Sequence, residues 1–202
     1  MSFAPPSPHR FVLLDRDGTV NVECDYLSRP DQLALYPGVG GALRQLRDLG
    51  CGLVLLTNQS GVARGYFDLA TVNRVHDRLR ELLRAEGVAL DGIYLCPHGP
   101  DDDCACRKPR TGMVDQAVAE LGFDPRQAFM VGDKAVDIDL GHAVGATPIL
   151  VRTGWGAKAE REAKCTPAVI VDDLAAAAAW ISQSIENDRA IEKNRAGETR
   201  PS

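Results

Sequence analysis

The sequence predicts an α/β fold in which a mainly parallel sheet lies between two layers of helices. Short runs of consecutive apolar residues alternate along the chain with stretches whose apolar residues recur at helical spacing. The connections are long enough to contain a helix, which implies parallel neighbouring strands with right-handed crossovers. These observations predict a three-layer α/β/α sandwich wound in the doubly-wound manner.

The first half of the chain begins with a predicted strand at 11–14, four apolar residues that run into the turn Asp-Arg-Asp-Gly-Thr at 15–19. A polar connection over 20–37 follows. Apolar residues at helical spacing and a terminal glycine predict a helix over 38–50. A second buried strand at 52–56 ends in the polar sequence Thr-Asn-Gln-Ser-Gly.

A long helix is predicted next, with Asp68 as its N-cap and an apolar face that continues to about Glu86. A short strand at 93–95 leads into a segment rich in cysteine. Thr111 is placed to cap the following helix, and the pair Asp124-Pro125 is typical of a cap and first turn.

The remaining predicted elements are a strand over 128–131, a helix over 136–144 and a strand over 148–151. An alanine-rich helix follows, capped by Asp172 or Asp173. No repeat or linker divides the sequence, and no large insertion separates its motifs. We therefore expect one domain without a separate cap domain.

We place this domain at residues 10–186, a length that allows a sizeable core. Residues 1–9 are expected to form a flexible N-terminus. Residues 187–202 are polar with mixed charge, which favours a disordered tail.

Composition limits the function classes. The chain has 202 residues and a formal net charge of -5, which argues against nucleic acid or an anionic membrane as its main partner. No stretch approaches the ~20 apolar residues of a membrane span. The N-terminal residues lack the apolar run of a secretory signal. We therefore expect a cytoplasmic protein, and a monomer.

Polar side chains follow the predicted strands. The carboxyl ends of parallel strands lie along one edge of a sheet, so these side chains should converge. They are Asp15 and Asp17 after the first strand, Thr57 and Asn58 after the second, and Asp133 after the fourth. If strand geometry continues past residue 14, Asp15 and Asp17 point the same way and can share one divalent metal. The loop before the helix that Thr111 is placed to cap adds Arg107 and Lys108. This set of side chains is typical of a magnesium-dependent phosphoryl-transfer site.

A second group of candidate ligands consists of Cys96, His98, Cys104 and Cys106. Three thiolates and one imidazole match a closed, structural zinc site of the Cys3His type. Such a site would fix the loop that presents Arg107. Free surface cysteines with an unrelated histidine, or a redox role for Cys104 and Cys106, are the alternatives.

The motifs resemble those of a known family. Asp15-Arg16-Asp17-Gly18-Thr19, Thr57-Asn58, Lys108-Pro109 and Gly132-Asp133-Lys134-Ala135-Val136-Asp137 resemble, in order, the four motifs of the haloacid dehalogenase (HAD) superfamily. The resemblance covers about residues 10–154.

The resemblance implies a covalent mechanism. Asp15 would attack phosphorus and become an aspartyl phosphate, while Asp17 would protonate the leaving alkoxide and later activate water. Mg²⁺ would be held by a carboxylate oxygen of Asp15, the backbone carbonyl of Asp17 and Asp133. Catalysis would also use Thr57, Arg107 and Lys108. The substrate would be contacted by Glu23, Cys24, Asp25, Tyr26, Asn58, Gln59, Ser60 and Lys134, with a salt bridge to nearby acids as the alternative role of Lys134.

The cysteine-rich loop is similar to that of the histidinol-phosphatase-related branch of this superfamily. Similarity to that branch implies an enzyme that removes the 7-phosphate of D-glycero-D-manno-heptose 1,7-bisphosphate. This reaction would belong to the biosynthesis of ADP- or GDP-heptose, a precursor of lipopolysaccharide or of the S-layer. The segment 57–65 and the segment 151–154 are similar to the heptose enzymes, and no dehydratase domain follows. The five residues between His98 and Cys104 are closer to the histidinol-phosphate type, which leaves histidinol-phosphate phosphatase as an alternative. A phosphotransferase and a zinc-organised binding module with an inactive site are further alternatives.

Overall fold

The computed structural model describes residues 10–198, with side chains through Asn194, and contains a six-stranded sheet. The strands are β1 (Arg10–Leu14), β2 (Cys51–Asn58), β3 (Gly92–Cys96), β4 (Phe129–Gly132), β5 (Thr147–Val151) and β6 (Val169–Val171). Their order is β3-β2-β1-β4-β5-β6, and every neighbouring pair is parallel. The carboxyl ends of β1, β2 and β4 therefore lie side by side.

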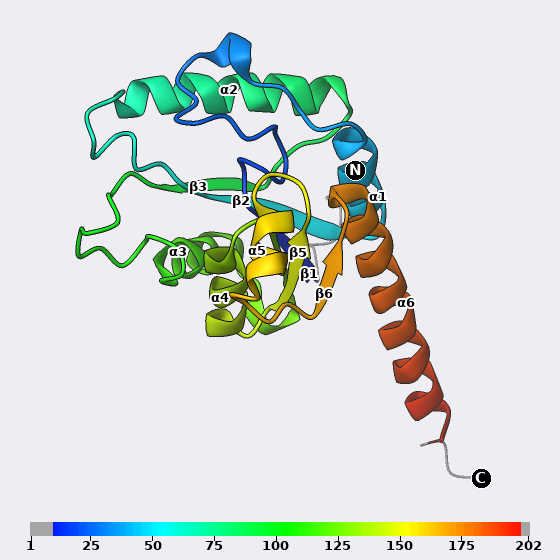
Figure 1. Cartoon of the computed structure of the whole chain (residues 1–202). Coiled ribbons are helices and arrows are strands. Elements are labelled where there is room, and N and C mark those ends of the chain that lie inside the picture. Colours follow the sequence, from blue (N-terminus) through cyan, green and yellow to red (C-terminus); the bar gives the residue numbers. More distant parts are fainter. Residues whose placement is uncertain (1–9, 199–202) are drawn as a thin grey trace.

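Helices cover both faces of the sheet (Figure 1). They are α1 (Val39–Asp48), α2 (Leu69–Ala85), α3 (Gly112–Leu121), α4 (Ala135–Val144), α5 (Gly156–Glu162) and α6 (Leu174–Glu198). Buried side chains of α1, α2 and α6 share one core cluster, whereas those of α3 and α4 belong to another. The predicted α/β/α sandwich is confirmed.

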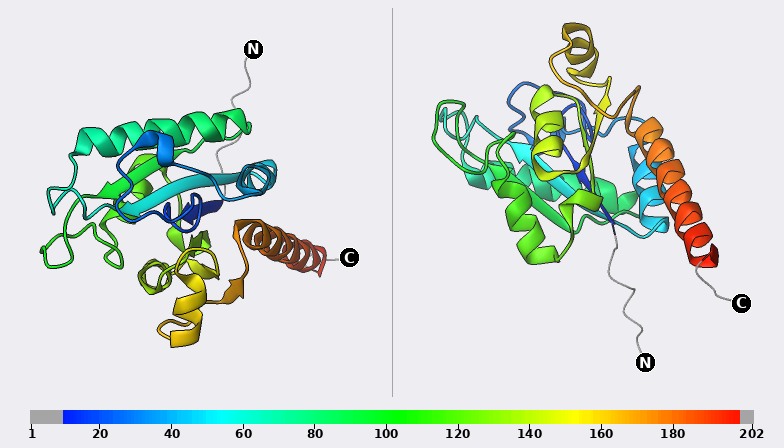
Figure 2. Two further views of the ribbon diagram at one scale, coloured as in Figure 1. Left: turned by 45° about the horizontal axis from the view of Figure 1, so that its top comes forward. Right: turned by 90° about the horizontal axis from the view of Figure 1, so that it is seen from below.

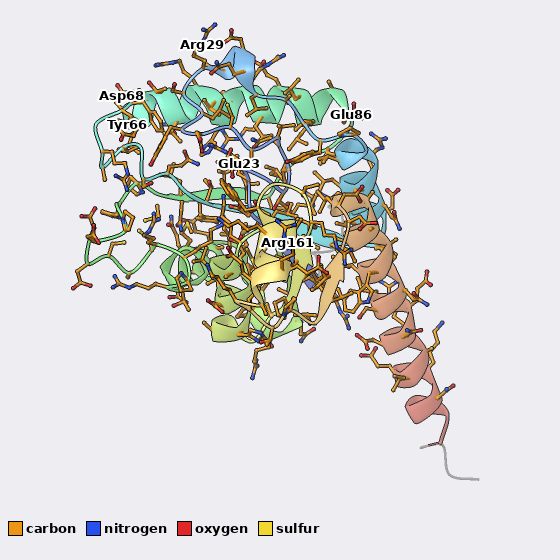
Figure 3. The ribbon with its side chains drawn as sticks, viewed as in Figure 1. Glu23, Arg29, Tyr66, Asp68, Glu86 and Arg161 are labelled. Carbon is orange, nitrogen blue, oxygen red and sulfur yellow. The ribbon has the colours of Figure 1, made fainter. Side chains whose placement is uncertain are left out.

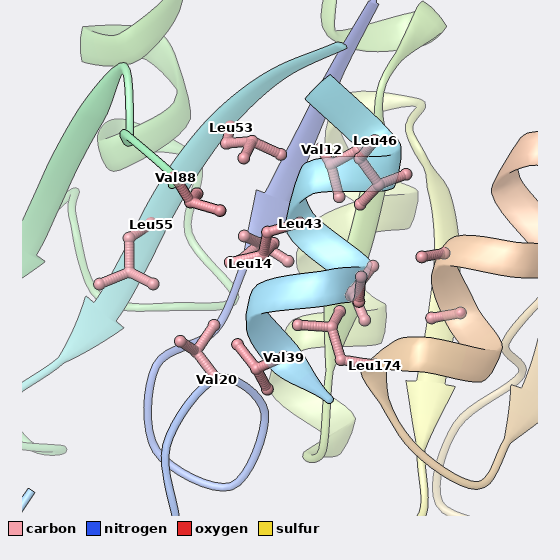
Figure 4. Packing of buried hydrophobic residues seen from close by; sticks show 14 of the residues in the cluster. Val12, Leu14, Val20, Val39, Leu43, Leu46, Leu53, Leu55, Val88 and Leu174 are labelled. Atoms are coloured by element: carbon pink, nitrogen blue, oxygen red, sulfur yellow. The ribbon is translucent and has the colours of Figure 1, made fainter. Parts of the chain in front are cut away.

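Strand β1 divides the core because its side chains alternate between the two faces of the sheet. Val12 and Leu14 pack against α1 and its neighbours, as Figure 4 shows, while Phe11 and Leu13 face the other layer. All four side chains are buried, and burying each contributes about 1.5–3 kcal/mol. The strand that carries Asp15 is therefore held firmly from both sides.

Three predicted caps are confirmed, whereas the side chain of Thr111 makes no capping hydrogen bond at the start of α3. The carboxylate of Asp124 accepts a hydrogen bond from the backbone N–H of Arg126. The carboxylate of Asp68 accepts a hydrogen bond from the backbone N–H of Thr71, and that of Asp173 accepts one from Ala176. Strand β6 and helix α5 were not predicted. Strand β6 has three half-buried residues at the sheet edge, and a segment that short carries no usable periodicity.

The prediction of a disordered tail from residue 187 is wrong for residues 187–198, which continue helix α6 beyond the body of the molecule (Figure 2). An ion pair of 2.8 Å joins Arg10 to Asp188, and Arg189 donates to the backbone oxygen of Leu49. These contacts fasten the polar part of the helix to the start of β1 and the end of α1. Residues 1–9, predicted to be flexible, and 199–202 lie outside the described residues.

Within residues 10–198, no helix is both long enough and apolar enough to cross a membrane, α6 included.

Candidate active site

A cleft of about 640 Å³ opens at the carboxyl edge of the sheet. Most of the predicted site residues line it. They are Asp17, Glu23, Cys24, Asp25, Tyr26, Asn58, Gln59, Ser60, Arg107, Lys108 and Lys134. Figure 3 labels Glu23 and Tyr66, which come from the loops after β1 and β2 that flank this region. The sheet thus gathers segments that are separated by more than a hundred residues of sequence.

Three buried carboxylates lie together at the floor of the site. Each of Asp15, Asp133 and Asp137 offers an oxygen within 4.8 Å of the others. The Nζ atom of Lys108 is 2.5 Å from Asp15 Oδ1 and 2.7 Å from Asp137 Oδ1, and it also donates to the backbone oxygen of Leu56. Lys108 is therefore held at once by the residue that follows β1, by β2 and by α4.

The charge of this cluster is incompletely balanced. Burial, and then the neighbouring charge of Asp15, raise the pKa of Asp133 from 3.8 to about 8. Asp133 Oδ1 is buried without a hydrogen-bond partner. Buried carboxylate oxygens in this arrangement are the donors that Mg²⁺ prefers, so the residues present fit a magnesium ion.

Two glycines allow the backbone to close around Asp133. A Cβ atom on Gly18 would lie 2.1 Å from Asp133 Oδ2, and one on Gly154 would lie 2.2 Å from it. Both glycines have positive φ, +88° and +56°. The N–H of Trp155 donates to the same oxygen at 2.8 Å. The loop after β5 therefore helps to orient this carboxylate, although sequence reasoning assigned it no role there.

The expectation that Asp15 and Asp17 present their carboxylates to a shared metal is not met. Strand β1 ends at Leu14, and the backbone oxygen of Arg16 accepts hydrogen bonds from the N–H groups of a tight turn. This turn breaks the alternation on which the expectation rested. The carboxylate of Asp17 lies outside the acidic cluster, and a role for its backbone carbonyl stays a prediction.

Instead, the Asp17 carboxylate lines the cleft and accepts four hydrogen bonds. Arg16 supplies two, at 3.1 and 2.6 Å, and Asn21 and Gln59 supply one each at 3.0 Å. Burial by itself raises the pKa of Asp17, but the charge of Arg16 and these hydrogen bonds outweigh it, so the pKa is lowered. The pKa of Asp17 is thus lowered whereas that of Asp133 is raised, although both residues belong to one site.

The last two residues of β2 and the residue after it organise the site from its other side. The side chain of Asn58 accepts from the backbone N–H of Lys108 at 3.1 Å and donates to its carbonyl oxygen at 3.3 Å. Gln59 donates to the hydroxyl of Thr57 at 2.8 Å. Asn58 therefore positions the Lys108 backbone, in addition to lining the cleft.

The cysteine-rich loop forms a second cluster. Donor atoms of Cys96, His98, Cys104 and Cys106 all lie within 4.8 Å of one another. The Sγ atoms of Cys96 and Cys104 are 3.7 Å apart. Two thiolates bound at about 2.3 Å to a tetrahedral zinc ion lie about 3.8 Å apart, so the residues fit zinc.

Comparison with known proteins places this site in a family. Residues 105–177 match a HAD-hydrolase-like family model. D-glycero-beta-D-manno-heptose-1,7-bisphosphate 7-phosphatase from Haemophilus ducreyi is 46% identical over 161 residues, which cover 76% of this chain and 88% of that protein. The chain belongs to the heptose-1,7-bisphosphate 7-phosphatase family of HAD-like hydrolases.

Other members agree with this assignment. The enzyme of the same name from Pseudomonas aeruginosa is 40% identical, covering 85% of this chain and 97% of that protein. A crystal structure of D,D-heptose 1,7-bisphosphate phosphatase from B. bronchiseptica, complexed with magnesium and phosphate, superposes with a TM-score of 0.81. It is 40% identical, and the match covers 87% of this chain and 99% of that chain.

The rim of the cleft carries both positively and negatively charged side chains. Lys134 forms an ion pair of 2.8 Å with Glu23, so the alternative role foreseen for Lys134 is present. Arg107 donates to the backbone oxygen of His98, which ties it to the cysteine-rich loop. Tyr26, with a left-handed φ of 52°, packs edge-on against Tyr66 with ring centroids 4.7 Å apart.

Sequence reasoning missed several cleft residues. Asp102, Arg110, Val136 and Trp155 also line the cleft. Arg110 and Val136 lie within or beside the predicted motifs, so proximity in sequence could have indicated them. Trp155 directly follows the segment 151–154, which is similar to the heptose enzymes, but only the pairing of β4 with β5 brings its loop to Asp133.

Because the pKa of Asp133 is raised, the amount by which Mg²⁺ stabilises the fold should depend on pH. Between 3.8 and about 8 the unfolded chain has released this proton while the folded chain retains it, so the free energy of unfolding falls as pH rises. Mg²⁺ favours the ionised form in the fold. We expect Mg²⁺ to raise the Tm by at least about 3 °C more at pH 8 than at pH 5.

Thermal unfolding of metal-free protein, with and without Mg²⁺ at both pH values, measures this effect. Asp133→Asn is the control and should abolish the pH dependence of the magnesium effect. Equal magnesium shifts at the two pH values would contradict the assignment of Asp133 to the cation.

Proposed function

We propose that this chain is a magnesium-dependent phosphatase that removes the 7-phosphate of D-glycero-D-manno-heptose 1,7-bisphosphate. One observation carries the proposal. Buried Asp15 lies beside Lys108 in a cluster with Asp133, whose Oδ1 atom has no hydrogen-bond partner, beneath a cleft large enough for a sugar phosphate. The names of the relatives support the substrate.

In the first step, a carboxylate oxygen of Asp15 forms a bond to phosphorus while the bond from phosphorus to the sugar oxygen breaks. The product on the protein is an aspartyl phosphate. Lys108 remains beside the reacting carboxylate because Asp137 and the Leu56 carbonyl also hold it. Its ammonium group balances the negative charge of the transferring phosphoryl oxygens, with Thr57 and Arg107 as further donors.

Asp17 then serves both halves of the reaction. A phosphate dianion bound nearby raises the pKa of Asp17, so the carboxylate takes up a proton. Asp17 then donates this proton to the leaving alkoxide. The deprotonated carboxylate next accepts a proton from the water that attacks the aspartyl phosphate. This attack releases inorganic phosphate and restores Asp15. The lowered pKa of Asp17 keeps its carboxylate deprotonated in the free protein, so the proton for the first step must be taken up when the phosphate binds.

Two metals complete the proposal. Magnesium would be held by Asp15 and Asp133, together with the backbone carbonyl of Asp17, and when bound it reduces the repulsion between carboxylate and phosphate. Zinc would be held by Cys96, His98, Cys104 and Cys106. With four protein ligands its role is structural, and it would fix the loop that carries Arg107 and Lys108.

A substrate panel tests the proposal. Phosphate release should be at least about tenfold more efficient, as kcat/KM, for the β-anomer of the heptose bisphosphate than for the α-anomer or histidinol phosphate. The β-anomer is chosen because the relatives from H. ducreyi and P. aeruginosa are named for it. A preference for histidinol phosphate would instead support the alternative that the short loop between His98 and Cys104 favours.

We extend the proposal to a monomer in the cytoplasm, supplying nucleotide-activated heptose for cell-envelope polysaccharide. A net charge of -5 supports the absence of nucleic acid among its partners. Light scattering coupled to size exclusion would measure the oligomeric state.

A further inference from the structure

A buried polar chain runs from helix α2 to the cleft. The side chain of Arg16 is among the most deeply buried in the described residues, with 1% of its surface exposed. One edge of its guanidinium binds both oxygens of Asp17, through Nε at 3.1 Å and Nη2 at 2.6 Å. The remaining nitrogen, Nη1, lies 3.2 Å from Nε2 of His76, which is 2% exposed.

The hydrogen bond between Arg16 and His76 has a defined direction. A guanidinium group has only donors and keeps its proton in proteins, so Nε2 of His76 must be the acceptor. The imidazole is therefore neutral, with its proton on Nδ1. Burial, followed by the charge of Arg16, lowers the pKa of His76 to about 3, which agrees with a neutral ring.

The location of His76 is unusual for a polar residue. It lies on the face of α2 whose other buried residues are Val72, Val75, Leu79 and Leu83. An apolar residue would fill this position more simply, whereas a buried guanidinium nitrogen without an acceptor is costly. Without His76, Nη1 would turn toward another acceptor, and the fixed fork of Arg16 would rotate away from Asp17.

We propose that His76 is a positioning residue for the phosphatase reaction, holding Arg16 so that Arg16 fixes the Asp17 carboxylate toward the cleft. Asn21 and Gln59 hold single oxygens of that carboxylate, and only Arg16 grips both. The inference rests on the proposed function, because the proton transfers assigned to Asp17 are what the positioning serves.

A comparison of leaving groups distinguishes positioning from a structural role. Cleavage of an alkyl phosphate needs a proton on the departing oxygen, whereas 4-nitrophenolate leaves readily without one. We expect His76→Leu to lower kcat/KM at least about tenfold on the heptose bisphosphate but less than about threefold on 4-nitrophenyl phosphate. His76→Gln can place an acceptor oxygen near the position of Nε2 and should recover most of the loss.

Leu79→Ala is the matched control, because it removes packing from the same buried face of α2 and keeps both partners of the hydrogen bond between Arg16 and His76. It should change kcat/KM on both substrates by the same factor, and thermal unfolding of each variant would establish that it is folded. Equal losses on both substrates in His76→Leu, or no recovery in His76→Gln, would overturn the inference alone. A wild-type chain inactive on every phosphate ester would overturn the proposed function as well.

Discussion

Replacing Asp15 with asparagine is expected to lower phosphate release from the heptose bisphosphate by at least about 10⁴-fold. The amide cannot form the covalent phosphoryl intermediate, and it removes one charge from the acidic cluster. Lys108 keeps its ion pair with Asp137 and its hydrogen bond to Leu56, so the variant should remain folded. Release of inorganic phosphate with time, at saturating Mg²⁺, measures the loss.

The matched control is Asp139→Asn on helix α4, an exposed carboxylate two residues beyond the buried Asp137. It should retain wild-type turnover. A separate measurement reports on the nucleophile without turnover: the wild-type chain should bind a metal fluoride that mimics the aspartyl phosphate, and Asp15→Asn should not. Turnover by Asp15→Asn within about tenfold of wild type would rule out the covalent mechanism.

Replacing Cys104 with serine is expected to damage stability and activity together. A serine hydroxyl is a poor zinc ligand, and the free energy of zinc binding is coupled to folding of the loop. We expect the Tm to fall by about 5–10 °C. Turnover should fall about 100-fold, because Arg107 and Lys108 directly follow the last ligand, Cys106, and small displacements of such groups are costly.

Bound zinc, measured by elemental analysis, should fall from about one ion per chain to near zero in this variant. Cys165→Ser is the matched control, since Cys165 is also half-buried but lies outside the cluster. If Cys104→Ser kept wild-type stability and turnover, a structural zinc site at this position would be untenable.

Much of the site was predictable because its chemistry sits immediately after apolar runs. Asp15 and Asp133 each follow a strand, and Thr57 lies near the end of one, that burial makes recognisable in the sequence, and parallel pairing brings those strand ends together. The four candidate zinc ligands were predictable for a different reason. Thiols and imidazole at such short spacing can converge through local turns, with little help from the rest of the fold.

Other features depend on which segments meet. The carboxylate of Asp17 turns away from the acidic cluster because the backbone oxygen of Arg16 organises a tight turn, an arrangement that strand alternation misses. His76 gave no signal on its helix, since its partner lies sixty residues away in sequence. The length of α6 was likewise not predictable from its own residues, because its polar part contacts Arg10 and the Leu49 carbonyl, which are distant in sequence.

The sequence by itself determined the strands and helices other than β6 and α5, the nucleophile candidate, the acidic residue after β4 and the candidate zinc ligands. Each of these depends on local spacing or on burial of a single segment. Only the tertiary structure decided that Asp137 shares Lys108 with Asp15, that the backbone N–H of Trp155 donates to Asp133, and that Arg16 is hydrogen-bonded to His76. These contacts join residues that are distant in the chain. Their partners are selected by packing of the whole fold, which no local pattern of residues specifies.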